Sequence, residues 1–181
     1  NNRSKIKVVA ATCNTNYRKL EKLKTKFNIQ RIGINNHKSA ERYKLLSSNN
    51  KRNLLIGNEN FSKLITKEID IVILAISGLS ALNISYDIVK SGKIFGLANK
   101  ECIISLGPRL ISLAKQHKTK IIPLDSEHNS IYRLLESNKN KFKSITITAS
   151  GGPFFNKKIS YLKNVTPSQA IKHPVWKMGK K

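Results

Sequence analysis

The 181-residue sequence has few of the features that mark several common classes of protein. Its two cysteines, Cys13 and Cys102, lie far apart without paired spacing, which argues against a disulfide framework or a zinc knuckle. No apolar run approaches the roughly 18 residues that a membrane span needs, and no apolar signal stretch follows Asn1. These absences favour a soluble intracellular protein with no membrane partner and no thiol redox chemistry.

Acidic residues are also scarce, since 10 Asp and Glu stand against 34 Lys and Arg, for a formal net charge of +24. Such an excess normally suggests binding to nucleic acid or to an anionic surface. The lysines are scattered along the whole chain among many Asn and Ile residues, and do not gather in one arm or helix face. Exposed charges are screened beyond about 8 Å at physiological salt. We therefore interpret these lysines as solvated and compositional and not as a dedicated nucleic-acid surface, and a small anionic substrate is compatible with either interpretation.

Short β-branched runs alternate with longer polar stretches whose apolar residues lie three and four apart, from Lys5 to about Asp125. This alternation is typical of an α/β fold with a doubly wound parallel sheet. The continuous apolar run at 71–74 predicts a strand that is buried on both faces of the sheet. The expected strands lie at 6–12, 31–34, 53–57, 69–76, 93–98 and 120–124.

The pattern changes after Asp125, where we expect a helix at 128–136, an alternating strand at 144–150 and a Gly-Gly-Pro turn. A further helix is expected to begin at Thr166, which precedes a proline and is followed three residues later by a glutamine, as in a capping box. These changes predict a Rossmann-like domain over residues 1–124 and the start of an α+β domain over residues 125–181.

Both ends of the sequence look cut. A doubly wound domain usually begins with a strand and a glycine-rich phosphate turn, but no GxGxxG-like segment occurs in the sequence. Either the fold is not a dinucleotide fold or its first βα unit is missing, and we favour the second interpretation.

The triplet Asp125-Ser126-Glu127 places two of the ten acids at the end of an apolar strand, at the sheet edge where α/β proteins bind ligands. In an extended segment the two carboxylates would point the same way and could converge on one hard cation such as Mg²⁺ or Mn²⁺. Two carboxylates are too few for a tight site, so a further ligand would have to come from elsewhere. The triplet also suits a helix start, with Asp125 or Ser126 as the cap and Glu127 favoured by the helix dipole.

Three further segments have both a chemical and a structural interpretation. Lys100 follows another strand at the same edge and could meet a phosphate or a substrate oxygen, or could simply begin a helix. The glycines at 151–152 allow close approach to a ligand, or only a turn. The segment 173–179, which holds the single Trp and the single Met, suits a mobile lid, although a lone Trp is more often a core residue.

Five segments, taken in order, closely resemble the 1-deoxy-D-xylulose 5-phosphate reductoisomerase family: LANKE (97–101), DSEHN (125–129), SGGPF (150–154), TPSQA (166–170) and HPVWKMGKK (173–181). The resemblance covers nearly the whole chain and is strongest from about Ile94 onward. Members of this family are NADPH-dependent enzymes of the methylerythritol phosphate route to isoprenoids. In the family, a metal chelates the substrate's carbonyl and hydroxyl oxygens while the carbon skeleton rearranges, and NADPH then reduces the resulting aldehyde.

The resemblance implies a role for individual residues. It implies that Asp125 and Glu127 bind Mg²⁺ or Mn²⁺, which favours the metal interpretation of the triplet over the cap. The residues matched to substrate contacts are Lys100, Ser126, Glu127, Ser150 and His173. Those matched to NADPH are Asn14, Thr15, Asn16, Asn99, Glu101 and Gly179. Trp176 matches the aromatic residue of the flexible loop that closes over the substrate, and the catalytic set is Lys100, Glu127, His173 and Trp176.

The sequence also departs from the family pattern. The opening glycine-rich turn has no counterpart, and the third metal carboxylate and the rest of the phosphate pocket would begin just after Lys181. Thr15 stands where the family usually has a Lys or Ser. It keeps one hydroxyl for a 2′-phosphate but no cation, which leaves the choice between NADP and NAD open. Leu79 also stands where a smaller side chain is expected.

We therefore expect an internal portion of a reductoisomerase whose activity belongs to the full-length protein, with no measurable turnover by these residues alone. Family membership implies a homodimer and a location in the bacterial cytoplasm or a plastid-type organelle, of which we favour the first. Two alternatives stay open, namely a basic non-catalytic fragment that binds nucleic acid and the remnant of a decayed gene.

Overall fold

The computed structural model describes residues 5–46, 53–137, 142–148, 151–172 and 174 of the chain. The chain divides into two compact units, residues 1–125 and residues 126–181. Within the described ranges, no helix combines the length and the apolar character that a membrane crossing requires.

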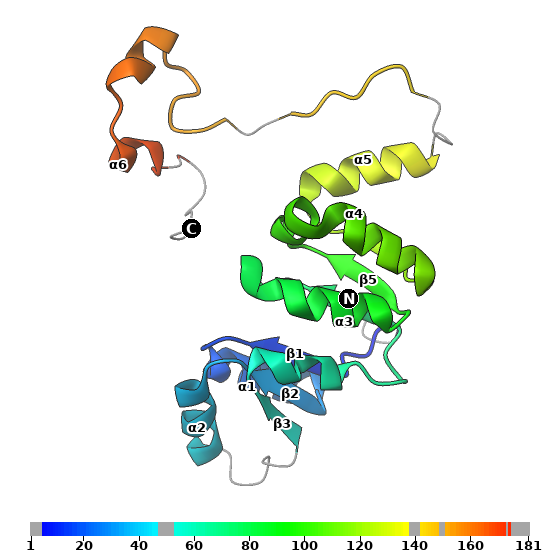
Figure 1. The fold of residues 1–181 in the computed structure, drawn as a ribbon. Helices are drawn as coiled ribbons and strands as arrows, with labels where there is room; N and C mark the ends of the chain where they lie inside the picture. The colour runs from blue at the N-terminus through cyan, green and yellow to red at the C-terminus, as the bar shows by residue number, and fades with distance from the viewer. Residues whose placement is uncertain (1–4, 47–52, 138–141, 149–150, 173, 175–181) are drawn as a thin grey trace. The chain divides into compact units, whose positions relative to one another are not determined.

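The first half of unit 1 is a three-stranded parallel sheet with two helices (Figure 1). Its strands lie side by side in the order β1-β2-β3, each paired in parallel with the next. Successive parallel strands need a crossover, and α1 and α2 supply the first two. The elements in chain order are β1 (Ala10–Cys13), α1 (Tyr17–Phe27), β2 (Arg31–Ile34), α2 (His37–Leu46) and β3 (Leu54–Ile56).

Local sequence explains where α1 begins and ends. The side chain of Asn16 accepts a hydrogen bond from the Lys19 amide (3.1 Å), which satisfies one of the unpaired N–H groups of the first turn. The helix ends at Asn28, which adopts the left-handed conformation that Asn tolerates. Its buried residue Leu20 joins the core of this half, together with Ile29, Ile32, Ile34, Ala40 and Tyr43.

The second half of unit 1 is another parallel sheet, in the order β4-β5-β6. Its crossover helices α3 and α4 contact each other and lie side by side in front of β5 in Figure 1. The elements are η2 (Asn58–Leu64), β4 (Ile71–Leu74), η3 (Leu79–Ala81), α3 (Leu82–Lys90), β5 (Ile94–Leu97), α4 (Lys100–Gln116) and β6 (Ile121–Pro123). The six expected strands of the first 125 residues are therefore all present, mostly shorter than predicted.

A second apolar core lies under α3 and α4 and links the two halves of unit 1. Its fully or nearly fully buried members include Phe95, Ile88 and Leu110. Phe61 of η2 belongs to the same core, and Ala10 of β1 packs against it. Burial of this apolar surface is the main source of stability for this part of the chain.

The parallel α/β class is confirmed, but the strands form two sheets and not one. A doubly wound fold places its first strand between the two halves of the sheet, and no strand in the described residues lies between β1 and β4. The prediction that β4 is buried on both faces is wrong, since the side chains of Ile71 and Ile73 are 56% and 65% exposed. The reason is that α3 and α4 cover one face only, and no described element covers the other.

Unit 2 contains α5 (Ser126–Ser137), η4 (Ile159–Asn164) and α6 (Pro167–Ala170). The helix expected at 128–136 is present and begins two residues earlier. The strand expected at 144–150 is wrong for its described residues, because residues 142–148 form no regular structure. Alternation alone does not make a strand: a strand needs a hydrogen-bonding neighbour, and the described part of the chain offers this segment none.

Two local predictions in unit 2 are confirmed. The segment after residue 150 turns sharply, with the Phe155 amide donating to the Gly152 carbonyl (3.1 Å) and Gly151 at φ 75°. Thr166 caps α6 in a capping box, because its amide donates to the Gln169 side chain (2.8 Å) while its hydroxyl accepts from the Gln169 amide.

Candidate functional site

The carboxyl ends of β5 and β6 bring together two residues that the sequence analysis singled out. The two strands are parallel neighbours, and Leu97 of β5 lies opposite Pro123 of β6. Lys100 follows Leu97 by three residues, and Asp125 follows Pro123 by two. Because parallel strands end at the same sheet edge, both side chains arrive at one place.

Lys100 and Asp125 form an ion pair in which Lys100 Nζ lies 2.9 Å from Asp125 Oδ2. The Asp125 side chain is only 13% exposed, whereas that of Lys100 is 50% exposed. A carboxylate this far removed from water needs hydrogen-bonding or cationic partners, and the ammonium is one of them. Lys100 begins α4, as the structural interpretation of this segment expected, and its predicted contact with a phosphate or substrate oxygen stays a prediction.

Asn99 holds the loop in front of this pair. Its side-chain nitrogen donates to the carbonyls of Ile76 (2.6 Å) and Gly78 (3.0 Å), and its side-chain oxygen accepts from the Cys102 amide (2.7 Å). Asn99 is 4% exposed and is the N-cap of α4. Both of its side-chain N–H groups are used within the protein, so Asn99 orders the start of α4 and the loop at 76–78.

Ser126 and Glu127 lie in the first turn of α5, so the prediction of an extended triplet is wrong. In a helix, side chains two residues apart point in different directions, unlike those of a strand. The Ser126 hydroxyl donates to Glu127 Oε2 (3.1 Å), and both residues are exposed. An acid in the first turn is favoured by the helix dipole, so the helix-start interpretation of this triplet describes its local structure.

A groove of about 370 Å³ lies within unit 2, between α5 and residues 142–148. Ser126 and Glu127 contribute polar atoms to its lining, and much of the rest is apolar, including Leu134, Phe142 and Ile145. Phe142 and Ile145 are about half exposed. Ser126 and Glu127 are the residues of this lining for which the sequence predicts substrate contacts.

The residues predicted at the adenosine end of the cofactor lie between β1 and α1. Asn16 is the cap of α1, and Thr15 is exposed. The Asn14 side chain accepts from Asn35 Nδ2 (3.1 Å), while Asn35 Oδ1 accepts from the Asn58 amide (2.9 Å). These asparagines tie together the carboxyl ends of β1, β2 and β3.

This edge of the first sheet also suits an anionic ligand. The first turns of α1 and α2 contain no acid. Unpaired N–H groups at helix N-termini favour negative charge nearby. Sequence reasoning missed Asn35 and Asn58, although the fact that Asn follows the second and third strands directly, or after one glycine, could have indicated them.

The two thiols are poorly suited to nucleophilic or redox chemistry. Burial raises the pKa of the Cys13 thiol. Burial also raises the pKa of Cys102, an effect that the Glu101 charge reinforces and a hydrogen bond with Ser85 partly opposes. Since the thiolate is the reactive form, these shifts leave both cysteines mainly as thiols at neutral pH.

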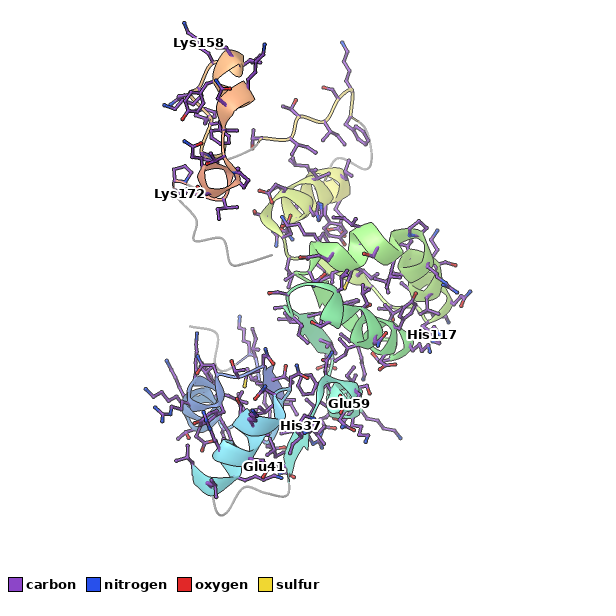
Figure 2. The ribbon with its side chains drawn as sticks, turned by 60° about the vertical axis from the view of Figure 1, so that its left-hand side comes forward. His37, Glu41, Glu59, His117, Lys158 and Lys172 are labelled. Carbon is purple, nitrogen blue, oxygen red and sulfur yellow. The ribbon has the colours of Figure 1, made fainter. Side chains whose placement is uncertain are left out.

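Four predicted site residues, Ser150, His173, Trp176 and Gly179, lie outside the described residues. Among the residues that are described, no group of three or more His, Cys, Asp or Glu side chains could hold a metal ion. His37 begins α2 and His117 follows the end of α4, as Figure 2 shows. A metal held by Asp125 and Glu127 therefore needs further ligands in addition to these two carboxylates.

Family models match both parts of the chain. Residues 1–107 match the model described as 1-deoxy-D-xylulose 5-phosphate reductoisomerase. Residues 121–181 match the model described as the C-terminal domain of the same enzyme.

Curated relatives carry the same name. The enzyme of Clostridium novyi is 39% identical over 182 residues, which cover 98% of this chain and 47% of the relative. That of Thermodesulfovibrio yellowstonii is 38% identical, with 98% of this chain and 46% of the relative covered. The chain spans about half the length of the curated relatives it matches.

Solved structures of reductoisomerases have the same fold as this chain. The reductoisomerase of Zymomonas mobilis in complex with NADPH has a TM-score of 0.85 and 30% identity, covering 96% of this chain and 46% of that one. A reductoisomerase in complex with NADPH, fosmidomycin and magnesium has a TM-score of 0.80 and 29% identity, covering 97% and 46%. The family model that spans residues 1–107 matches more than half of the sequence, and the chain therefore belongs to the 1-deoxy-D-xylulose 5-phosphate reductoisomerase family.

Proposed function

We propose that this chain forms the cofactor domain and the start of the catalytic domain of an enzyme that converts 1-deoxy-D-xylulose 5-phosphate to 2-C-methyl-D-erythritol 4-phosphate. The reaction uses NADPH and a divalent metal and belongs to isoprenoid biosynthesis. The observation that carries the proposal is the ion pair of Lys100 and Asp125 at the carboxyl ends of β5 and β6. It brings a cation for the substrate and a carboxylate for the metal to the sheet edge where α/β proteins bind ligands.

The donors present fit Mg²⁺ or Mn²⁺. Both ions prefer oxygen ligands, and carboxylate oxygens are offered by Asp125, just before α5, and by Glu127, in its first turn. Asp125 and Glu127 would hold the ion together with ligands from elsewhere in the full-length protein. When bound, the metal supplies Lewis-acid polarisation of the substrate's oxygens.

The protein's own residues prepare this chemistry. Lys100 offers an ammonium group to an anionic or carbonyl oxygen of the substrate. Ser126 and Glu127, which line the groove of unit 2, offer a hydroxyl and a carboxylate to the substrate's hydroxyl groups. Asn99 fixes the start of α4 and thereby the place from which Lys100 reaches the site.

NADPH supplies the hydride for the reaction. The first sheet fits the adenosine end of this cofactor. Asn14, Thr15 and Asn16 present polar groups in front of α1, whose first turn has no acid to repel a phosphate. Thr15 can donate one hydrogen bond to a 2′-phosphate. We assign Asn99 and Glu101, at the start of α4, to the same cofactor.

Further parts of the proposal follow from family membership. They include a role for Ser150 and His173 in holding the substrate, for Trp176 in a closing loop and for Gly179 beside NADPH. They also include a homodimer and a location in the bacterial cytoplasm, in keeping with the bacterial sources of the relatives.

The proposal is tested by the product that the full-length protein forms. The purified protein is incubated with 1-deoxy-D-xylulose 5-phosphate, NADPH and Mg²⁺, and the product is identified by NMR. We expect 2-C-methyl-D-erythritol 4-phosphate, and none after the metal is removed with EDTA. A folded full-length protein that leaves the substrate unchanged under these conditions would contradict the proposed function.

The 181 residues by themselves are expected to show no measurable turnover. The described part of this chain holds no third acidic, histidine or cysteine ligand near Asp125 and Glu127, and the chain has no glycine-rich pyrophosphate turn. The measurement is the NADPH absorbance at 340 nm with substrate and Mg²⁺ present. Consumption of NADPH that depends on 1-deoxy-D-xylulose 5-phosphate would show that these residues already form a complete site.

A further inference from the structure

Lys100 occupies a position beside Asp125 that a metal ion bound to the same carboxylate would also need. The ammonium lies 2.9 Å from Asp125 Oδ2, in direct contact with an oxygen that the proposed function assigns to the metal. The side chain of Lys100 is half exposed and that of Asp125 largely buried. Lys100 can therefore swing away into solvent, whereas Asp125 stays at the sheet edge.

We propose that Lys100 is a built-in competitor of the divalent cation, pairing with Asp125 until the metal displaces its ammonium group toward the substrate. This inference rests on the proposed function, since it takes Asp125 as a metal ligand. Two positive charges at one carboxylate repel each other by Coulomb's law, so metal binding and the ion pair oppose each other.

The exchange has a consequence for the order of events at the site. Before the metal binds, the ion pair compensates a largely buried carboxylate, whose charge would otherwise be costly there. Once displaced, the ammonium is available for an anionic substrate oxygen. Because linkage is reciprocal, a substrate that holds Lys100 away from Asp125 also strengthens metal binding. Metal and substrate thus bind cooperatively through one side chain.

The test measures Mn²⁺ binding to the full-length protein without substrate or cofactor, by electron paramagnetic resonance of the free ion. Lys100→Gln removes the competing charge and is expected to tighten Mn²⁺ binding roughly 5- to 20-fold. Lys100→Arg keeps the charge and is expected to bind Mn²⁺ within twofold of the wild type. Lys100→Met is a second neutral variant, should the Gln variant fail to fold, and is expected to behave in the same way.

Lys115→Gln is the matched control. It removes the same charge from the same helix, α4, but about 22 Å along the helix axis from Lys100. This distance exceeds the screening length of about 8 Å at physiological salt, so Mn²⁺ affinity should stay within twofold of the wild type. An equal tightening in Lys115→Gln and Lys100→Gln would reduce the effect to overall charge and overturn the inference.

Asp125→Asn separates this inference from the proposed function. If Asp125→Asn loses Mn²⁺ binding while Lys100→Gln binds as the wild type does, or more weakly, the metal site stands and the competition is refuted. If Asp125→Asn binds Mn²⁺ as the wild type does, the assignment of Asp125 to the metal is refuted, and the competition with it. The exchange is supported only if both neutral variants of Lys100 bind Mn²⁺ more tightly than the wild type and Lys115→Gln does not.

Discussion

Replacing Asp125 by Asn in the full-length enzyme is expected to lower kcat by at least about 10³-fold, equivalent to about 4 kcal/mol of lost transition-state stabilisation. Asn keeps the size of the side chain but removes the charge that a hard cation requires. The same loss is expected for Glu127→Gln. The measurement is the steady-state rate of NADPH oxidation at saturating substrate and Mg²⁺.

Asp87→Asn is the control for this prediction, since Asp87 is an exposed acid on α3 that we assign to no ligand. It should leave kcat within twofold of the wild type. The metal assignment would be contradicted by Asp125→Asn and Glu127→Gln variants that fold normally and retain kcat within tenfold of the wild type.

Replacing Asn99 by Ala is expected to destabilise unit 1 by about 3 kcal/mol. Loss of the helix cap costs about 1 kcal/mol, and each unpaired carbonyl left at Ile76 and Gly78 adds about 1 kcal/mol or more. The thermal midpoint of the full-length protein should fall by about 4 °C. Differential scanning calorimetry of the full-length protein measures this change.

Asn36→Ala is the matched control, because the Asn36 side chain caps α2 through the Ser39 amide (2.9 Å) and makes no other hydrogen bond that we identify. We expect it to cost about 1 kcal/mol. Asn99→Asp keeps the cap acceptor but places a carboxylate oxygen against the Ile76 and Gly78 carbonyls in a buried site, and should cost at least as much as Asn99→Ala. If Asn99→Ala and Asn36→Ala have equal midpoints, the bonds from Asn99 to the Ile76 and Gly78 carbonyls contribute nothing.

Much of unit 1 could be predicted because local patterns determine its elements. The strand at 31–34 has the predicted bounds, since the apolar run RIGI is enclosed by polar residues. The capping box at Thr166 was equally readable, because its hydrogen bonds join residues only three positions apart.

The wrong predictions concern structure that depends on contacts between distant parts of the chain. Ile71 and Ile73 have the pattern of a strand that is covered on both faces, but both are exposed. The sequence of a strand does not determine which other elements pack against its faces. The alternation at 144–148 suits a strand in the same way, but a strand forms only beside a partner.

At the candidate site, too, local features could be predicted from the sequence and contacts between distant residues could not. The order of motifs identified Lys100 and Asp125 separately, and each was assigned to a ligand. That the two side chains pair with each other follows from the parallel register of β5 and β6, which joins residues 25 positions apart and which no local pattern encodes. The extended form of the triplet at 125–127 failed because the helix signals of Ser126 and Glu127 determine its structure.

The most direct test of the account is the initial rate of NADPH oxidation by the full-length protein, measured with 1-deoxy-D-xylulose 5-phosphate and Mg²⁺ together and with each omitted. We predict oxidation only when both are present. A folded full-length protein that oxidises no NADPH in the complete mixture would contradict the central claim, and would favour one of the two alternatives, a basic fragment that binds nucleic acid or the remnant of a decayed gene.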